Sequence, residues 1–183
     1  MNHYTDISIL PDPEFPATVL MNSLYTKLHR VLCDLNSTRI GVSFPQHKIM
    51  LGNVLRIHGA VDDLTELQQK DWLGGMAGYC QVSSIGDVPT GVKHRVIRRK
   101  QATMSHSKLN RLLKRGSITQ DEITQYKARM FANGLDEPYI ELQSGSNGRR
   151  HRRYIDLGPL LDKPVAGVFD QFGLSKTGTV PWF

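Results

Sequence analysis

The sequence predicts an α+β protein with two regions of different character. Short segments in which apolar and polar residues alternate predict strands, and longer segments whose apolar residues recur every three or four positions predict helices between them. The charge also divides the chain, since residues 1–92 carry a net charge of −3 and residues 93–183 carry +9. Such a division favours two domains.

Alternation and proline positions predict the first elements of the chain. Ile7 and Ile9 alternate with polar residues in a first strand, and Pro11 ends it. Pro16 suits the first turn of a helix, and apolar residues, mostly leucine, recur at helical spacing from there to about Leu35. A strand followed by a long helix is therefore expected at the start.

Three more strands and a second helix complete the acidic half. The strands are expected at residues 40–44, 54–57 and 79–85, and the helix between the last two, with Asp62 or Asp63 as its cap. The resulting order, β-α-β-β-α-β over residues 3–86, is the ferredoxin-like arrangement. We expect it to form a domain of residues 1–88, although this fold hosts many functions and indicates none by itself.

The basic half is expected to form a second domain, residues 89–183, after a hinge at residues 86–90. Its expected elements are, in chain order, a strand at 95–101, a helix at 107–115, a helix from Thr119, strands at 138–143, 150–156 and 165–172, and a closing turn through Gly173 and Gly178. Thr119 and Glu122 have the spacing of a capping box, which predicts where the second helix begins.

Positive charge is concentrated in two short windows of this half. Nine Lys or Arg residues and no acid lie from Lys93 to Arg115, and four arginines follow at positions 149, 150, 152 and 153. The helix at 107–115 has leucines on one face and basic residues on another, namely Lys108, Arg111, Lys114 and Arg115. A charge segregated in this way indicates a polyanionic partner.

Other residues of the basic half are suited to nucleic acid. Arg99 and Gln101 lie two apart in a predicted strand, so they share a face, and their side chains can read guanine and adenine in an accessible major groove. The segment 144–148, Ser-Gly-Ser-Asn-Gly, leads into Arg149 and Arg150. It is either a simple hairpin turn or a loop whose backbone N–H groups and hydroxyls bind a phosphate.

His29 lies on the predicted long helix, away from its leucine stripe. A single histidine is most often structural or solvated, yet an imidazole can take the proton of a ribose 2′-hydroxyl at neutral pH. No two of the seven histidines have metal-ligand spacing, so neither a metal nor another cofactor is expected.

Cysteine usage and hydropathy exclude several classes of protein. Cys33 and Cys80 are far apart and neither belongs to a CxxC pair, which argues against a disulfide framework and a structural zinc. No apolar segment approaches the roughly 18 residues needed to span a bilayer, and the acidic N-terminal segment is not typical of a targeting peptide. We therefore expect a cytoplasmic protein with reduced cysteines and no membrane partner.

Several motifs together give a family resemblance. They are Pro11-Asp-Pro-Glu-Phe-Pro16, Lys27-Leu-His29, Arg39-Ile-Gly-Val-Ser-Phe-Pro45, Leu55-Arg-Ile-His58 and, most specific, Gly173-Leu-Ser-Lys176 with Val180-Pro-Trp-Phe183. With them the chain resembles, nearly end to end, the repeat-processing endoribonuclease of type I-F CRISPR systems. That family implies a metal-independent cut of CRISPR repeat RNA at the 3′ base of a stem-loop, with a 2′,3′-cyclic phosphate and a 5′-hydroxyl as product ends.

The resemblance also implies residue roles and a partner. His29 takes the position of the general base, Ser144 that of the serine that holds the nucleophilic ribose, and Ser146 a supporting position. Arg99 and Gln101 take the positions of the base-reading pair, and the basic helix that of an arginine-rich helix in the RNA major groove. The protein is expected to keep its product and to serve as a subunit of a surveillance complex with other CRISPR-associated proteins on the mature guide RNA.

Three positions depart from the family pattern, and two other functions stay open. Phe172 stands where the family has tyrosine, so the hydroxyl of that supporting residue is absent. His151 replaces an aromatic residue that stacks beneath the stem, and Leu112 stands where an arginine is expected. The first alternative is an RNA-hairpin-binding subunit that does not cleave. The second, less favoured, is a DNA-binding helix-turn-helix around Gly116.

Overall fold

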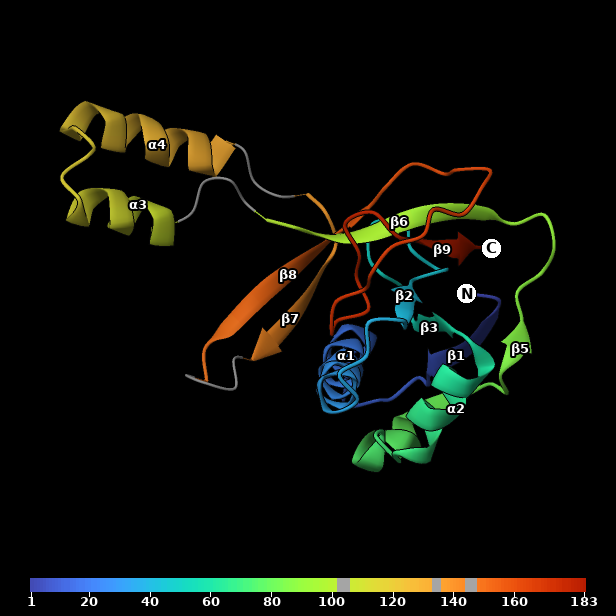
Figure 1. Cartoon of the computed structure of the whole chain (residues 1–183). Helices are drawn as coiled ribbons and strands as arrows, with labels where there is room; N and C mark the ends of the chain where they lie inside the picture. The colour runs from blue at the N-terminus through green and yellow to red at the C-terminus, as the bar shows by residue number, and fades with distance from the viewer. Residues whose placement is uncertain (102–105, 133–135, 144–147) are drawn as a thin grey trace.

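The computed structural model describes residues 1–101, 106–132, 136–143 and 148–183 and contains two antiparallel sheets (Figure 1). The first sheet consists of β1 (His3–Ile9), β2 (Gly41–Ser43), β3 (Val54–Gly59), β4 (Cys80–Val82) and β5 (Gly86–Asp87). Its strand order is β2-β3-β1-β4, and β5 also pairs with β1. Between these strands lie α1 (Ala17–Asp34), α2 (Val61–Gln69) and a 3-10 turn at Gly74–Tyr79. The predicted order β-α-β-β-α-β is therefore present.

The second sheet lies in the basic half and is built around one long strand. It contains β6 (Lys93–Lys100), β7 (Tyr139–Gln143), β8 (Arg150–Leu157) and β9 (Thr179–Trp182), in the order β7-β8-β6-β9. The first part of β6 pairs with β9 and the second part with β8. A mixed α and β protein with antiparallel sheets, as the sequence predicts, is thus confirmed.

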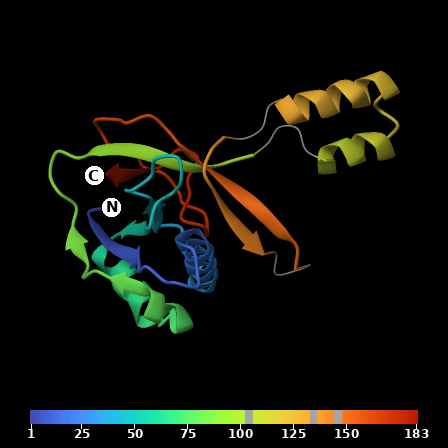
Figure 2. The same cartoon turned by 180° about the vertical axis from the view of Figure 1, so that it is seen from behind.

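The helices of the basic half, α3 (His106–Lys114) and α4 (Gln120–Ala132), stand away from both sheets (Figures 1 and 2). The predicted capping box is present, since the N–H and hydroxyl of Thr119 both contact the Glu122 carboxylate, at 2.8 and 2.9 Å. Leu109 of α3 and Tyr126 of α4 are buried. Leu113, which belongs to the predicted leucine face, is 45% exposed, so this face is only partly covered.

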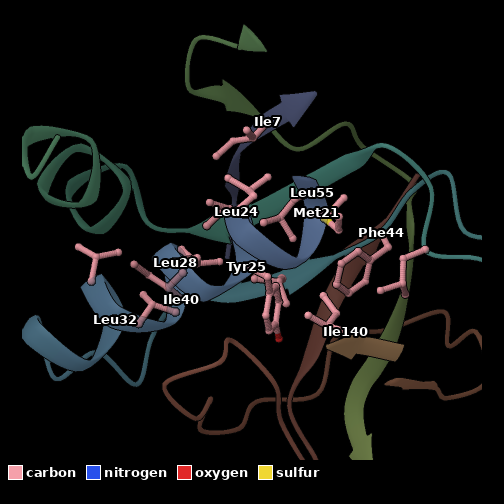
Figure 3. Packing of buried hydrophobic residues seen from close by; sticks show 14 of the residues in the cluster. Ile7, Met21, Leu24, Tyr25, Leu28, Leu32, Ile40, Phe44, Leu55 and Ile140 are labelled. Atoms are coloured by element: carbon pink, nitrogen blue, oxygen red, sulfur yellow. The ribbon is translucent and has the colours of Figure 1, made fainter. Parts of the chain in front are cut away.

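One apolar cluster connects the two sheets. Figure 3 shows the face of α1 packed on β1, β2 and β3, with Leu24, Leu28 and Leu32 pointing toward Leu55 and Ile40. The basic half contributes further members of the same cluster, which are Ile97, Ile140, Leu142, Ile155, Phe169, Leu174 and Val180. The ribbon of β7 and β8 runs beside α1, and the N–H of Glu141 donates to the side-chain oxygen of Asn22 at 3.0 Å. These contacts fix α1 against the basic half.

The predicted strand at residues 165–172 is wrong. Residues 163–170 form an irregular segment, and the closing strand β9 lies at Thr179–Trp182, after the predicted turn, where no strand was predicted. The reason is a close backbone approach, because a Cβ on Gly167 would lie 2.3 Å from the nitrogen of Gly178. The two glycine segments pack directly on each other, and the edge of β6 pairs with β9 instead.

Two smaller predictions are also corrected. The N-cap of α2 is Ala60 and has no side-chain cap hydrogen bond. Asp63 instead accepts from Arg39, whose Nη2 lies 2.6 Å from Oδ1, so this carboxylate is used for an ion pair. The predicted hinge at residues 86–90 begins with β5, which is hydrogen-bonded to β1. No helix among the described residues is long and apolar enough to cross a membrane.

His58, in β3 of the first sheet, is a fully buried titratable residue. Its Nε2 lies 2.8 Å from the hydroxyl of Ser43, whereas Nδ1 has no hydrogen-bond partner among the described residues. Burial, and secondarily the positive charge of Arg56, lower the pKa of His58 to about 3. The histidine therefore stays neutral in the folded protein at neutral and mildly acidic pH.

We expect the free energy of unfolding to fall as the pH drops below about 6.5, because the unfolded chain then binds a proton that buried His58 does not accept until about pH 3. A full difference of one proton corresponds to about 1.4 kcal/mol per pH unit. His58→Asn does not titrate, so urea unfolding between about pH 6 and about pH 5 should depend less on pH for the variant. Equal slopes for the two proteins would contradict this account.

Candidate active site

His29 lies in the C-terminal half of α1, on the side that faces residues 171–172. Its ring stacks on the ring of Phe172, with centroids 3.5 Å apart and planes at 13°. Its Nδ1 lies 2.8 Å from the main-chain carbonyl oxygen of Gln171. A carbonyl oxygen only accepts, so Nδ1 carries the hydrogen and Nε2 keeps its lone pair in the neutral ring. The imidazole is thus oriented for taking a proton at Nε2.

The segment that holds His29 is itself fixed from several sides. The hydroxyl of Tyr25 donates to the carbonyl oxygen of Phe172 at 2.7 Å. The Asp170 carboxylate accepts from the N–H groups of Phe172 and Leu174 at 2.8 and 3.0 Å. Gly173 has a φ of +69°, and a Cβ there would lie 2.7 Å from the side chain of Val42. A tight turn that requires glycine therefore presents Gln171 and Phe172 to the helix.

Tyr25 supports this contact from the core. It is fully buried one helical turn before His29, and burial raises the pKa of its hydroxyl well above the ordinary range. The hydroxyl consequently remains a hydrogen-bond donor at neutral pH. Cys33, one turn after His29, places Sγ 3.6 Å from Nδ1. Burial, with the Asp34 charge, raises the pKa of that thiol, which favours its neutral form.

Arg153 of β8 occupies the other face of Phe172. Its Cζ lies 3.4 Å from the ring centroid, and two groups at this distance cannot share one face, so Phe172 lies between His29 and Arg153. Arg153 is 7% exposed. Burial and the charge of Arg99 both lower the pKa of its guanidinium. Sequence reasoning missed this residue, although it shares the inward parity of Ile155 on the same strand.

Arg99 and Gln101 lie beside Arg153 in one cleft. The cleft has a volume of about 830 Å³, and its polar lining includes Arg99, Gln101, Arg153, Asp170 and Lys176. On β6 the neighbours of Arg99 are paired, Arg98 with Asp156 at 2.6 Å and Lys100 with Glu137. Arg99 has the opposite parity and turns to the cleft. The structure thus brings the two residues together, in the cleft that Arg153 also lines.

The other predicted phosphate contacts lie on exposed surfaces. The side chains of Lys108, Arg111, Lys114 and Arg115 are exposed on and just after α3. Arg149, Arg150 and His151 are exposed at the start of β8, where Arg150 forms a long ion pair with Glu141 at 3.3 Å. These groups lie on the protruding helix pair and on the β7–β8 ribbon, on either side of the β6 end.

Ser144 and Ser146 lie outside the described residues, so their predicted place opposite His29 stays a prediction. Gly148 at the end of their segment is described, has a φ of +65°, and accepts from the side chain of Gln143 at 3.1 Å. Among the residues that the structure does describe, no three His, Cys, Asp or Glu side chains are grouped so that they could hold a metal ion.

The sequence matches a known protein family. The family model for the CRISPR-associated protein Cas_Csy4 matches residues 4–183. The chain belongs to this family. Two relatives are called CRISPR-associated endonuclease Cas6/Csy4, one from Escherichia coli (strain UTI89 / UPEC) and one from Pseudomonas aeruginosa (strain UCBPP-PA14). They are 39% and 40% identical to this chain, and each alignment spans all of both proteins.

The resemblance inferred from the sequence motifs of this Cas_Csy4 member is therefore confirmed. A solved structure of the CRISPR endoribonuclease Cse3 bound to a 19-nucleotide RNA aligns with 98% of this chain and 100% of that chain. Its TM-score is 0.39 and its identity 13%, so this likeness carries no argument about the site.

Proposed function

We propose that the protein is an endoribonuclease that cleaves CRISPR repeat RNA at the 3′ base of a stem-loop, by attack of a ribose 2′-hydroxyl and without a metal. The observation that carries the proposal is the 2.8 Å contact between His29 Nδ1 and the Gln171 carbonyl oxygen, from which we infer that Nδ1 carries the hydrogen of the neutral ring. Nε2 is then left as a base, in a chain whose family relatives are named endonucleases.

In the proposed reaction His29 Nε2 takes the proton of the 2′-hydroxyl just upstream of the cut. The 2′-oxygen then forms a bond to the adjacent phosphorus, and the bond from phosphorus to the 5′-oxygen breaks. The departing 5′-oxygen takes up a proton from the imidazolium or from water. The products are a 2′,3′-cyclic phosphate on the upstream fragment and a 5′-hydroxyl on the downstream one. Ser144 would hold the nucleophilic ribose, and Ser146 would support that loop.

Phe172 contributes orientation rather than chemistry in this proposal. The ring has no hydroxyl, so it neither gives nor takes a proton, but its stacking at 3.5 Å restricts rotation of the imidazole. A general base must lie within hydrogen-bond reach of the proton it removes. A ring fixed by both a hydrogen bond and a stacking contact meets that requirement without a tyrosine.

The basic half would hold the RNA stem. Arg99 and Gln101 would read bases at the bottom of the stem, since both line one cleft next to the site. The basic face of α3 would lie along phosphates in the major groove, which opens near a helix end. Arg149 and Arg150 would add phosphate contacts, and His151 would stack on the lowest pair. A surface of this kind holds a hairpin equally well before and after the cut.

We also propose how the protein is organised and where it acts. Residues 1–88 would form the ferredoxin-like domain that carries His29, which the strand order β2-β3-β1-β4 supports. Residues 89–183 would form the RNA-binding domain. With the mature guide RNA retained, the protein would join other CRISPR-associated proteins as a subunit of a surveillance complex in the cytoplasm.

The test is cleavage of the hairpin of the repeat encoded beside this protein, in the presence of excess EDTA. We expect one cut at the 3′ base of the stem, at the same rate as without the chelator, because no step above requires a divalent ion. Loss of cleavage in EDTA, with hairpin binding retained, would contradict the metal-free mechanism. Binding without cleavage under all conditions would instead favour the RNA-binding subunit.

Arg99→Ala and Arg111→Ala should weaken hairpin binding in different ways. Loss of a bidentate base contact at Arg99 should cost about 1–3 kcal/mol and relax discrimination at one stem pair. Loss of an exposed phosphate contact at Arg111 should weaken all hairpins alike and lower the salt slope by about one. The measurement is the Kd of each variant for the repeat hairpin and for single-pair variants at several salt concentrations. Equal losses on every hairpin would show that Arg99 reads no base.

A further inference from the structure

Arg153 is a buried charge whose hydrogen bonding is incomplete. Only 7% of the residue is exposed, and its Nε is buried with no hydrogen-bond partner. Within the described parts of the chain, no carboxylate forms an ion pair with it at 4 Å or less. Buried guanidinium groups are normally paired and hydrogen-bonded, since an unsatisfied buried donor is costly. The guanidinium is therefore a buried cationic donor with unused hydrogen-bonding capacity.

The contacts that Arg153 does have compensate the charge only in part. The Phe172 ring gives a cation–π contact at 3.4 Å. Asp170 attracts the guanidinium at longer range, but its Oδ1 already accepts from two backbone N–H groups. Arg99 acts against it, and together with burial lowers the pKa of Arg153. A second cation beside a buried arginine is unfavourable unless an anion lies between them.

The cleft beside Arg153 is suited to such an anion. Arg99, Arg153 and Lys176 line it with three cationic groups against the single carboxylate of Asp170. At about 830 Å³ the cleft is larger than one ion and leaves space for a sugar and a base. Guanidinium is the side-chain group that matches the geometry of phosphate oxygens best. A phosphodiester with its nucleoside fits both the charge and the size.

We propose that Arg153, together with Lys176, binds one backbone phosphate of the RNA in this cleft, next to the base-reading pair Arg99 and Gln101. This inference rests on the proposed function and adds a phosphate site to it. Only the Phe172 ring separates Arg153 from His29, so the phosphate is a near neighbour of the one that is cut. Arg153 is then a binding residue that also positions Phe172, and RNA in the cleft stabilises the ring on which His29 stacks.

The test uses a repeat hairpin made uncleavable by a 2′-deoxy sugar upstream of the cut. Single phosphates around the cut are replaced, one at a time, by neutral methylphosphonates. Wild-type protein should lose affinity by about tenfold to a hundredfold at one position, as for loss of a charge-assisted hydrogen bond. Arg153→Met should bind the unmodified hairpin more weakly by a similar factor and show no further loss at that position.

Two more variants separate this site from a general effect of charge or folding. Arg152→Met removes the adjacent, exposed arginine, which contacts Tyr139 on the other face of β8, and should keep the position-specific loss. Lys176→Met alters only an exposed residue of the cleft, so it tests the same position even if Arg153→Met does not fold. In Lys176→Met the loss of affinity caused by a methylphosphonate should become smaller only at the RNA phosphate assigned to Arg153.

A scan in which wild type, Arg153→Met and Lys176→Met lose affinity equally at every position would overturn the phosphate site. That outcome leaves the proposed function intact, because cleavage of the all-ribose hairpin by the wild type is measured in parallel. Conversely, the wild type could fail to cleave the all-ribose hairpin and still lose affinity at one phosphate in an Arg153-dependent way. That result would reject the nuclease and retain the phosphate site.

Discussion

A repeat hairpin with a 2′-deoxy sugar just upstream of the cut should bind the protein normally and remain intact. The 2′-oxygen is the attacking atom in the proposed reaction, so its removal leaves no nucleophile, whatever the state of His29. In the proposed function binding depends on the basic half, where the net charge is +9, and one hydroxyl would contribute little to it. The measurement compares the Kd and single-turnover cleavage of the deoxy and all-ribose hairpins.

The matched control for this substrate is a hairpin with its 2′-deoxy sugar one nucleotide further upstream. That hairpin should be cut at close to the rate of the all-ribose hairpin. Cleavage of the first deoxy hairpin would mean that water attacks the phosphate, and the transesterification would be wrong. DNA, which has no 2′-hydroxyl, could then be a substrate as well.

His29→Ala should slow cleavage by about 10²–10⁴-fold, the usual contribution of a general base. Hairpin affinity should change by less than about 1 kcal/mol, or about fivefold in Kd. The half-buried ring contributes a stacking contact on Phe172, a hydrogen bond to Gln171 and a weak contact with Cys33, and alanine is a strong helix former, so α1 should persist. Single-turnover rates and Kd values on the same hairpin provide both numbers.

Arg30→Ala is the matched control for His29→Ala. Arg30 is the next residue of α1, is exposed, and lies away from Phe172 near Lys27 and Asp34. We expect its removal to leave the rate at saturating protein nearly unchanged. Cleavage by His29→Ala at the wild-type rate would make His29 a structural residue. A parallel loss of rate and affinity would indicate that the ring binds RNA rather than activating the hydroxyl.

The sequence predicted the acidic half well because its elements are periodic and sharply ended. Leucine at helical spacing predicted α1, and the apolar alternation of the first half predicted its four main strands. The segment at residues 163–178 was not predictable in the same way. Its fold depends on the contact between Gly167 and Gly178, which are eleven residues apart and carry no periodic signal. The N-cap of α2 was predicted wrongly for another reason. Asp63 has the residue type of a cap, but its carboxylate forms an ion pair with Arg39, 24 residues away in the sequence.

Only the site residues that belong to a sequence motif or to a predicted strand face could be predicted. His29 was assigned a catalytic role through the family resemblance, and strand parity predicted a shared face for Arg99 and Gln101, which line one cleft. The partners that orient His29 were not foreseeable, since Gln171 and Phe172 are more than 140 residues away and act through a carbonyl and a ring. Arg153 was grouped with exposed arginines, although the strand that carries it turns it inward.

The central claim is that a ribose hydroxyl, activated by His29, attacks the neighbouring phosphate. Its most direct test is the mass of the two fragments produced from the all-ribose hairpin in EDTA. We predict a 2′,3′-cyclic phosphate at the end of the upstream fragment and a 5′-hydroxyl on the downstream fragment. A 3′-hydroxyl together with a 5′-phosphate would contradict the account, because those ends require attack by water.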